Sequence, residues 1–195
     1  MSIILTESVA LPPFSRKEIL RYAGCRETSE SVDNLLDKCI EKSKDIFVGS
    51  VCYGVFDLEI CDNVCKIGGI NILSKALSKN LADCEKTVIF GATVGVGIDR
   101  LIMKYSRIAP SEAVMYQAIG AERIEALCDA FCQKTEKTFG KRLKPRFSPG
   151  YGDLPLSVQR DIFSLLDCKK IGLSLNESLL MSPTKSVTAF VGISK

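Results

Sequence analysis

The chain has 195 residues, a hydrophobic content of 46% and a net charge of +3, which provides enough apolar material for one sizeable core. The small net charge does not favour nucleic acid or an anionic membrane as a partner, and no apolar run is long enough to span a bilayer. The short apolar patch at the N-terminus lacks a preceding basic segment, so we expect no signal peptide and a cytoplasmic location. One domain is the default expectation, and two small domains are the alternative.

The first half of the chain predicts two helices followed by strands. Ser15 and Glu18 form a capping box, which marks the start of a helix. Apolar residues then recur at helical spacing, and stretches rich in Val, Tyr, Phe and Ile follow. The expected elements are a helix over 15–23, a helix over 29–45, strands over 51–60 and 64–67, and a helix over 73–81.

The second half predicts one long helix between strands. Along that helix an apolar stripe is formed by Tyr116, Gly120, Ile124, Leu127 and Phe131. Near the end of the chain, apolar residues alternate with Thr188 and Phe190, as in a half-buried strand. The expected elements are a strand over 86–93, helices over 98–105, 110–139 and 157–166, and strands over 178–181 and 186–193. Because helices and strands do not alternate regularly, we predict an α+β fold, one compact domain with a mixed or antiparallel sheet and flanking helices.

Histidine is absent and cysteine is abundant. The nine cysteines are odd in number and irregularly spaced, so we expect free thiols that are mostly buried. The lack of histidine excludes Ser–His and Cys–His nucleophilic catalysis. Any chemistry carried out by this protein must therefore proceed without imidazole.

The segment Arg146–Tyr151 (RFSPGY) is the strongest candidate for a binding loop. Pro149 fixes its own φ angle, and glycine permits backbone shapes that direct peptide groups toward a ligand. Arg146 offers a planar fork for a carboxylate or phosphate, and Tyr151 offers an aromatic face with a polar tip. On residue chemistry alone, the alternative is a plain surface turn.

This loop belongs to a longer pattern that resembles a known family. RFSPGYGDLP is followed by a predicted helix and then by LNESLLMSPTKSV, which ends at Val187. The order, spacing and residue types are similar to the tail of the activation (reactivation) domain of cobalamin (vitamin B12)-dependent methionine synthase. The resemblance is specific over residues 86–195 and looser over residues 1–85, and it implies an activation-domain-like unit over residues 1–195.

The resemblance implies an S-adenosylmethionine site. Arg146 would bind the methionyl carboxylate, and Ser148 and Gly150 would provide main-chain contacts. Tyr151 would lie at the mouth of the site, near the reacting face, both as a ligand-binding residue and as the candidate catalytic residue. The family also places an acid from the long helix near the ligand, and Glu125 is the nearest match.

The residues around Glu125 suit this role. At helical spacing the carboxylate shares a face with small residues, which would let a ligand approach closely and would pair the acid with a cation: Ala118, Ala121, Cys128 and Cys132. The alternative is that Glu125 is a solvated residue at the edge of the apolar stripe. No metal ligand is expected in the site.

The chain also departs from the family pattern. The synthase loop has a Cys and a His shortly after its tyrosine, whereas this chain has Gly152, Asp153 and Leu154, so any role of those two residues cannot be transferred. The acid that the N-terminal part of the family domain contributes to the ligand has no clear counterpart either.

The function implied is that of a reactivation subunit that acts in trans on a cobalamin-dependent methionine synthase or a related corrinoid methyltransferase. It would supply the methyl group of S-adenosylmethionine for reductive methylation of oxidised cobalamin. The chain has no Asp-x-His-x-x-Gly motif, so the cobalamin would be carried by the partner. A solvated helix end, where cations are favourable, explains most of the basic stretch 141–146. The same stretch would also suit an acidic electron donor such as a flavodoxin-like protein. The alternatives are a non-catalytic module that senses S-adenosylmethionine or binds a corrinoid protein, and a redox or metal protein built on the cysteines.

Two weaker patterns remain. Gly91, Gly95 and Gly97 follow a predicted strand as in a phosphate loop, but neither full nucleotide-binding motif is present, which favours a plain turn. A thiolate metal site would combine Cys61 and Cys65 with Cys52 or Cys84, but it would lack the usual paired Cys-x-x-Cys spacing.

Overall fold

A six-stranded antiparallel sheet forms the centre of the computed structural model, which describes residues 3–195. Five strands follow the order β4-β3-β2-β5-β8, and β1 pairs with β2 beside β3. The strands of this sheet are β1 (Ile4–Ser8), β2 (Ser50–Cys61), β3 (Val64–Ile67), β4 (Ile70–Leu73), β5 (Cys84–Thr93) and β8 (Ser186–Ser194). A separate two-stranded ribbon is formed by β6 (Ser174–Leu175) and β7 (Met181–Ser182).

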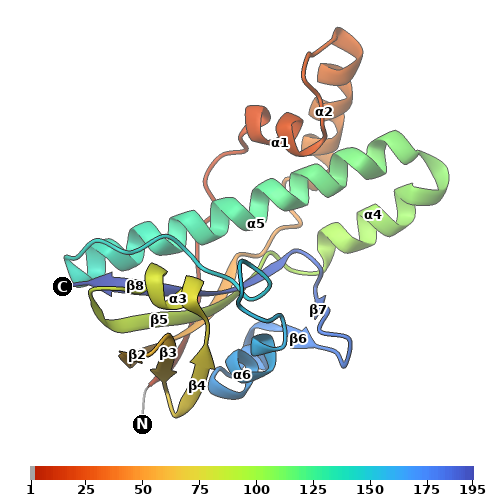
Figure 1. Cartoon of the computed structure of the whole chain (residues 1–195). Coiled ribbons are helices and arrows are strands. Elements are labelled where there is room, and N and C mark those ends of the chain that lie inside the picture. The colour runs from red at the N-terminus through yellow and green to blue at the C-terminus, as the bar shows by residue number, and fades with distance from the viewer. Residues whose placement is uncertain (1–2) are drawn as a thin grey trace.

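Helices flank both faces of this sheet, as Figure 1 shows, with α5 on one side and α6 on the other. Two further helices, α1 and α2, pack against α5 on the side away from the sheet. The helices are α1 (Arg16–Tyr22), α2 (Glu30–Ser43), α3 (Lys75–Asn80), α4 (Gly97–Ile108), α5 (Pro110–Phe139) and α6 (Val158–Leu165), and a 3-10 turn covers Cys168–Ile171. The predicted α+β class with an antiparallel sheet and flanking helices is therefore confirmed.

The sheet separates two apolar clusters. On one face, β5 and β8 pack against α5, and the cluster includes Phe90, Val191 and Phe131. On the other face, the same strands meet α3, α6 and the 3-10 turn, and this cluster includes Ile89 and Phe190. Both faces of the central strands are thus removed from water, which is the main source of stability in such an arrangement.

The long helix α5 has the predicted bounds, Pro110–Phe139. Pro110 stands in the first turn, where its missing N–H costs nothing, and Gly140 ends the helix in the left-handed conformation at φ 63°. All five residues of the predicted apolar stripe are buried. Local signals and tertiary packing therefore specify the same helix.

Several predicted elements differ from the structure. Strand β8 is buried on both faces rather than one, because Thr188 and Phe190 are covered by the second apolar cluster and its neighbours. Residues 178–180 form a turn, and only Met181 of that predicted strand belongs to β7. Strands β1 and β4 were not predicted, and Leu73 lies in β4 rather than in the helix, which begins after its N-cap Ser74.

The glycine-containing turn after β5 is a packing feature. A Cβ atom on Gly97 would lie 2.8 Å from the carbonyl oxygen of Ile46, so the close approach of that segment requires glycine. The N–H of Gly95 donates to the hydroxyl of Thr93 at 3.2 Å. These contacts support the plain-turn interpretation over the phosphate loop.

Among residues 3–195, no helix combines the length and the apolar character needed to cross a membrane.

Candidate functional site

The candidate loop is reached through a segment that lies along β8. After Gly140 the chain turns back, and residues 142–147 run antiparallel to the end of β8. The N–H of Lys144 donates to Gly192 O at 2.8 Å, and Phe147 and Phe190 exchange two hydrogen bonds of 2.9 Å. This pairing fixes the segment that carries Arg146 to the edge of the central sheet.

The loop itself is closed by its own main chain. The N–H of Gly150 donates to Leu154 O at 2.9 Å, and the N–H of Tyr151 donates to Ser148 O at 3.3 Å. Gly150 and Gly152 have φ angles of 93° and 57°, in the region that favours glycine. Because the N–H of Gly150 is used within the loop, its carbonyl is the main-chain group left for a ligand.

Asp153 anchors the loop to helix α3. Its carboxylate accepts hydrogen bonds from the Ser74 hydroxyl at 2.5 Å and from the N–H groups of Lys75 at 2.8 Å and Ala76 at 3.1 Å. These bonds, that from Ser74 first, lower the pKa of Asp153 below its ordinary value. Asp153, at a position where this chain differs from the synthase loop, therefore holds the loop against helix α3.

Arg146 lies between the loop and helix α5, where it contacts two carboxylates. Its guanidinium donates to Glu125 at 2.7 Å and also to Asp129. The arginine side chain is 23% exposed, whereas those of Glu125 and Asp129 are 44% and 63% exposed. Burial alone would lower the pKa of Arg146, but the hydrogen bond to Asp129 and the surrounding negative charge outweigh it and raise that pKa.

A groove of about 1030 Å³ opens beside this ion-pair cluster. Four of the predicted site residues line it, namely Glu125, Arg146, Ser148 and Tyr151. The fifth, Gly150, lies in the same loop but is not among the lining residues. The groove thus joins the predicted loop to an acid of α5 that lies 21 residues earlier in the sequence.

The surroundings of Glu125 differ in part from those predicted. Cys128 and Ala118 are buried in the core, so they do not form an open face of small residues around the acid. Glu125 is half-exposed and paired with Arg146, rather than simply solvated at the edge of the apolar stripe. The carboxylate is therefore held at the groove by charge and hydrogen bonding.

Several polar residues of the groove were not predicted from the sequence, and four of them bear on its chemistry. Asp129 follows Glu125 by one helical turn, and this spacing was available as a signal. The other three each have a buried side-chain oxygen without a hydrogen-bond partner: Asn80, Gln159 and Thr188. They come from α3, α6 and β8, so only the fold brings them together.

The cysteines offer little support for a metal centre. Cys65 is buried with its sulfur 3.3 Å from the Ser78 hydroxyl, while Cys61 is exposed. Within the part of the chain that the structure describes, no group of three or more His, Cys, Asp or Glu side chains is placed to hold a metal ion. Cys132 lines the groove, and burial raises the pKa of its thiol.

Comparison with known proteins identifies the fold. No family model matches the sequence, and no curated protein sequence matches it either. Among solved structures, the chain is similar to the MetH reactivation domain, crystallised with bound AdoHcy, with a TM-score of 0.68 and 14% sequence identity. The match covers 97% of this chain and 78% of that one. At this identity the likeness establishes one conclusion, that the chain has the fold of the MetH reactivation domain.

Proposed function

We propose that the groove beside Arg146 binds S-adenosylmethionine. The observation that carries this proposal is the arrangement of Arg146 with Glu125 and Asp129 at the edge of the groove. The similar reactivation domain was crystallised with AdoHcy, an analogue of this ligand, and supports the choice. We further propose that the whole chain, residues 1–195, forms the functional unit.

The residues present suit a ligand with an amino-acid end. Arg146 has five N–H donors and uses two of them in hydrogen bonds to Glu125 and Asp129, so donors remain for a ligand carboxylate. The two carboxylates carry enough exposed surface to accept hydrogen bonds from an ammonium group and to attract a sulfonium. The groove volume of about 1030 Å³ is at the upper end of typical ligand sites.

Tyr151 would act at the entrance of the site. Its side chain is 69% exposed while it also lines the groove, so it would lie between a bound ligand and an approaching partner. Ser148 and the carbonyl of Gly150 would supply the main-chain contacts. These roles require no proton transfer, which agrees with a chain that contains no histidine.

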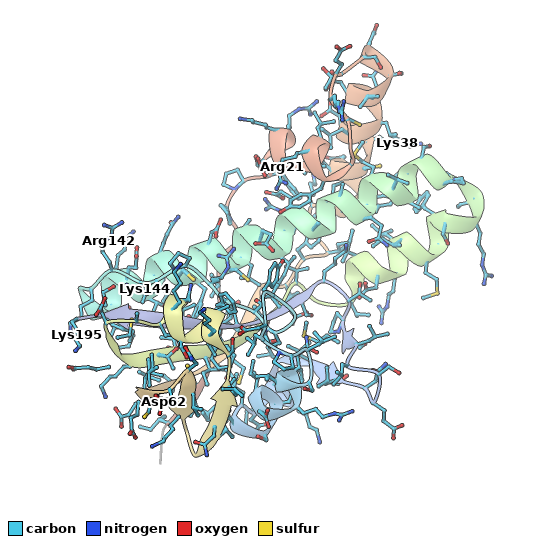
Figure 2. The ribbon with its side chains drawn as sticks, in the orientation of Figure 1. Arg21, Lys38, Asp62, Arg142, Lys144 and Lys195 are labelled. Atoms are coloured by element: carbon cyan, nitrogen blue, oxygen red, sulfur yellow. The ribbon has the colours of Figure 1, made fainter. Side chains whose placement is uncertain are left out.

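The ligand would supply a methyl group for transfer to the cobalamin of a partner protein. The chain's own residues would bind the ligand, orient it toward the groove entrance and exclude water from it. We propose that the protein acts in trans as a reactivation subunit for a cobalamin-dependent methionine synthase or a related corrinoid methyltransferase. Figure 2 places Arg142 and Lys144 near the C-terminal end of α5, where they would suit an acidic, flavodoxin-like electron donor.

Isothermal titration calorimetry with S-adenosylmethionine tests the proposal. Wild-type protein should bind, and Arg146→Ala should weaken binding by about 10²-fold, because hydrogen bonds to charged groups contribute roughly 1.5–3 kcal/mol. Arg21→Ala is the matched control, since Arg21 is also in an exposed ion pair, with Glu18, and lies on α1 (Figure 2). Absence of binding by the wild type would overturn the ligand assignment.

A second experiment separates methyl transfer from sensing. The protein is mixed with an oxidised corrinoid partner, a reductant and methyl-labelled S-adenosylmethionine, and label on the cobalamin is measured. We expect transfer that depends on Arg146. Binding without transfer would instead favour a module that senses S-adenosylmethionine or holds a corrinoid protein.

A further inference from the structure

We propose that Gln159 and Thr188 form a neutral hydrogen-bonding subsite in the groove, which receives the nucleoside part of the ligand. The inference rests on the proposed function for the identity of that ligand. It adds two residues outside the loop and outside the sequence pattern that pointed to it.

The observation is a pair of buried polar atoms with unmet hydrogen-bonding capacity. Gln159 is 6% exposed and Thr188 is 2% exposed, and both line the groove. Among residues 3–195, the Oε1 atom of Gln159 and the Oγ1 atom of Thr188 have no hydrogen-bond partner. A buried polar atom without a partner destabilises the folded state, so native proteins rarely keep one without a use.

A third atom in the same groove strengthens the case. The side-chain amide of Asn80 donates to Pro145 O at 3.2 Å, while its Oδ1 is buried without a partner. The described residues contain four such side-chain atoms, and three of them line this one groove. Their concentration at one place points to a ligand rather than to scattered packing defects.

The side chains of Gln159 and Thr188 are chemically suited to the uncharged part of the ligand. A side-chain amide and a hydroxyl each offer both donor and acceptor groups. The edge of adenine presents an amino donor beside a ring-nitrogen acceptor, which an amide can match with two hydrogen bonds, and a ribose presents hydroxyls. A carboxylate, ammonium or sulfonium would be poorly stabilised by buried neutral groups, and these charges find better partners at Arg146, Glu125 and Asp129.

The places of the charged residues and of Gln159 in the fold indicate how the ligand would be oriented in the groove. Glu125 and Asp129 belong to α5, on one face of the sheet, whereas Gln159 belongs to α6, on the other face (Figure 1). The groove is lined from both sides, and the segment that carries Arg146 lies along the edge of β8 between them. The amino-acid end would therefore lie toward α5 and the nucleoside end toward α6.

The test measures ligand affinity and the stability of the free protein in the same variants. Thr188→Val and Gln159→Met keep the side-chain size and remove the hydrogen-bonding atoms. Each should weaken S-adenosylmethionine binding by roughly fivefold to tenfold, while the melting temperature of the free protein stays unchanged or rises, since no internal hydrogen bond is lost. Adenosine binding should fall in parallel, and methionine binding should not change.

Thr87→Val is the matched control. Thr87 is also fully buried in the central sheet, but its hydroxyl donates to Val191 O at 3.2 Å and it does not line the groove. This variant should lower the melting temperature and leave the affinity for S-adenosylmethionine unchanged. If Thr188→Val instead behaved like Thr87→Val, Thr188 would have a structural role and the inference would be wrong.

The outcomes separate this inference from the proposed function. Wild-type binding of S-adenosylmethionine with unchanged affinity in Thr188→Val and Gln159→Met would overturn the subsite and leave the proposed function intact. Adenosine binding that depends on Thr188, without any binding of S-adenosylmethionine, would keep a nucleoside subsite and overturn the proposed function. Absence of binding to both ligands would overturn both.

Discussion

Two arginines form ion pairs with neighbouring parts of α5 and have opposite surroundings: Arg123 belongs to the helix, and Arg146 reaches it from the loop segment. Arg123 is 2% exposed and is enclosed by Glu122, by the carbonyl oxygens of Pro12 and Pro13, and by the ring of Phe14 at 4.1 Å. Arg146 is 23% exposed, and its two carboxylate partners are more exposed still. The Arg123 cluster is closed, because its guanidinium is almost sealed from solvent although the cluster borders a smaller groove of about 550 Å³. The Arg146 cluster is open, because it faces the larger groove of about 1030 Å³.

The difference lies in how many donors the protein itself satisfies. Arg123 makes four hydrogen bonds within the chain, two of them to Glu122. Arg146 makes two hydrogen bonds to carboxylates and keeps donors for another acceptor. An arginine with its donors satisfied inside the fold contributes to structure, whereas one left partly unsatisfied at a groove is available for a ligand.

Replacement of Arg123, the arginine of the closed cluster, should cause the largest loss of stability. Arg123→Leu leaves the carboxylate of Glu122 buried and unpaired, which should cost about 3–5 kcal/mol of unfolding free energy. Urea denaturation followed by circular dichroism measures the loss. Arg146→Leu is the comparison and should cost below about 1 kcal/mol, as exposed ion pairs do.

The double variant Arg123→Leu/Glu122→Leu provides the control for this prediction. It removes both charges, so it should be more stable than Arg123→Leu alone. Equal losses for Arg123→Leu and Arg146→Leu would contradict the division into a closed and an open cluster.

Replacement of Arg146, the arginine of the open cluster, by lysine should have the next largest effect, this time on ligand affinity. Lysine keeps the charge but cannot form two parallel hydrogen bonds with one carboxylate. Arg146→Lys should therefore weaken S-adenosylmethionine binding about tenfold, which corresponds to about 1.4 kcal/mol, with an unchanged urea midpoint. Full affinity in this variant would show that Arg146 acts as a point charge only.

Replacement of Asp153, which anchors the loop to α3, should have a smaller and pH-dependent effect on the melting temperature. The pKa of Asp153 is lowered in the folded protein from an ordinary value of 3.8, so its contribution to stability is fully present above that value. That contribution is lost as the pH falls through the lower folded pKa. Asp153→Ala should therefore melt a few degrees below wild type at pH 6, and the difference should shrink below pH 4.

Thermal unfolding at a series of pH values provides the measurement. Asp57→Ala is a suitable control, because Asp57 is an exposed carboxylate that pairs with Lys86. A difference between Asp153→Ala and wild type that stayed constant down to pH 3 would contradict the assigned role of the ionised carboxylate.

Changes at Tyr151 should have the smallest effect on stability. Its side chain is largely exposed, so Tyr151→Ala should change the unfolding free energy by less than about 0.5 kcal/mol. We expect a small loss of ligand affinity and slower methyl transfer to a corrinoid partner, measured with labelled ligand, with Tyr151→Phe intermediate. Normal transfer by Tyr151→Ala would remove the tyrosine from the proposed site.

The sequence predicted best those elements that local signals specify. The apolar stripe, Pro110 and Gly140 together define α5, and its bounds agree with the structure. The burial of β8 on both faces was not predictable in the same way, because Thr188 is a polar residue that only the packing of other elements covers. Strand β1 exists through pairing with β2, more than 40 residues away, which no local pattern reports.

In the candidate site, too, residues that belong to a sequence pattern were predictable and residues placed by tertiary packing were not. Family resemblance pointed to Arg146 and Glu125, and the structure brings their side chains into contact. Gln159 and Thr188 carry no motif, and their significance depends on being buried, unpartnered and next to one groove. Residues that act through tertiary placement alone become visible only when the fold is known.

The closed arginine cluster also determines how α5 is turned about its own axis. Successive residues of an α-helix are rotated by about 100°, so a shift of one residue along the axis would swing Glu125 and Asp129 away from Arg146. Such a shift would also pull Glu122 and Arg123 out of their enclosure by Pro12, Pro13 and Phe14. The N-terminal segment, remote in sequence from the groove, thereby acts with the buried apolar stripe of α5 to hold the rotational setting in which the helix presents its carboxylates.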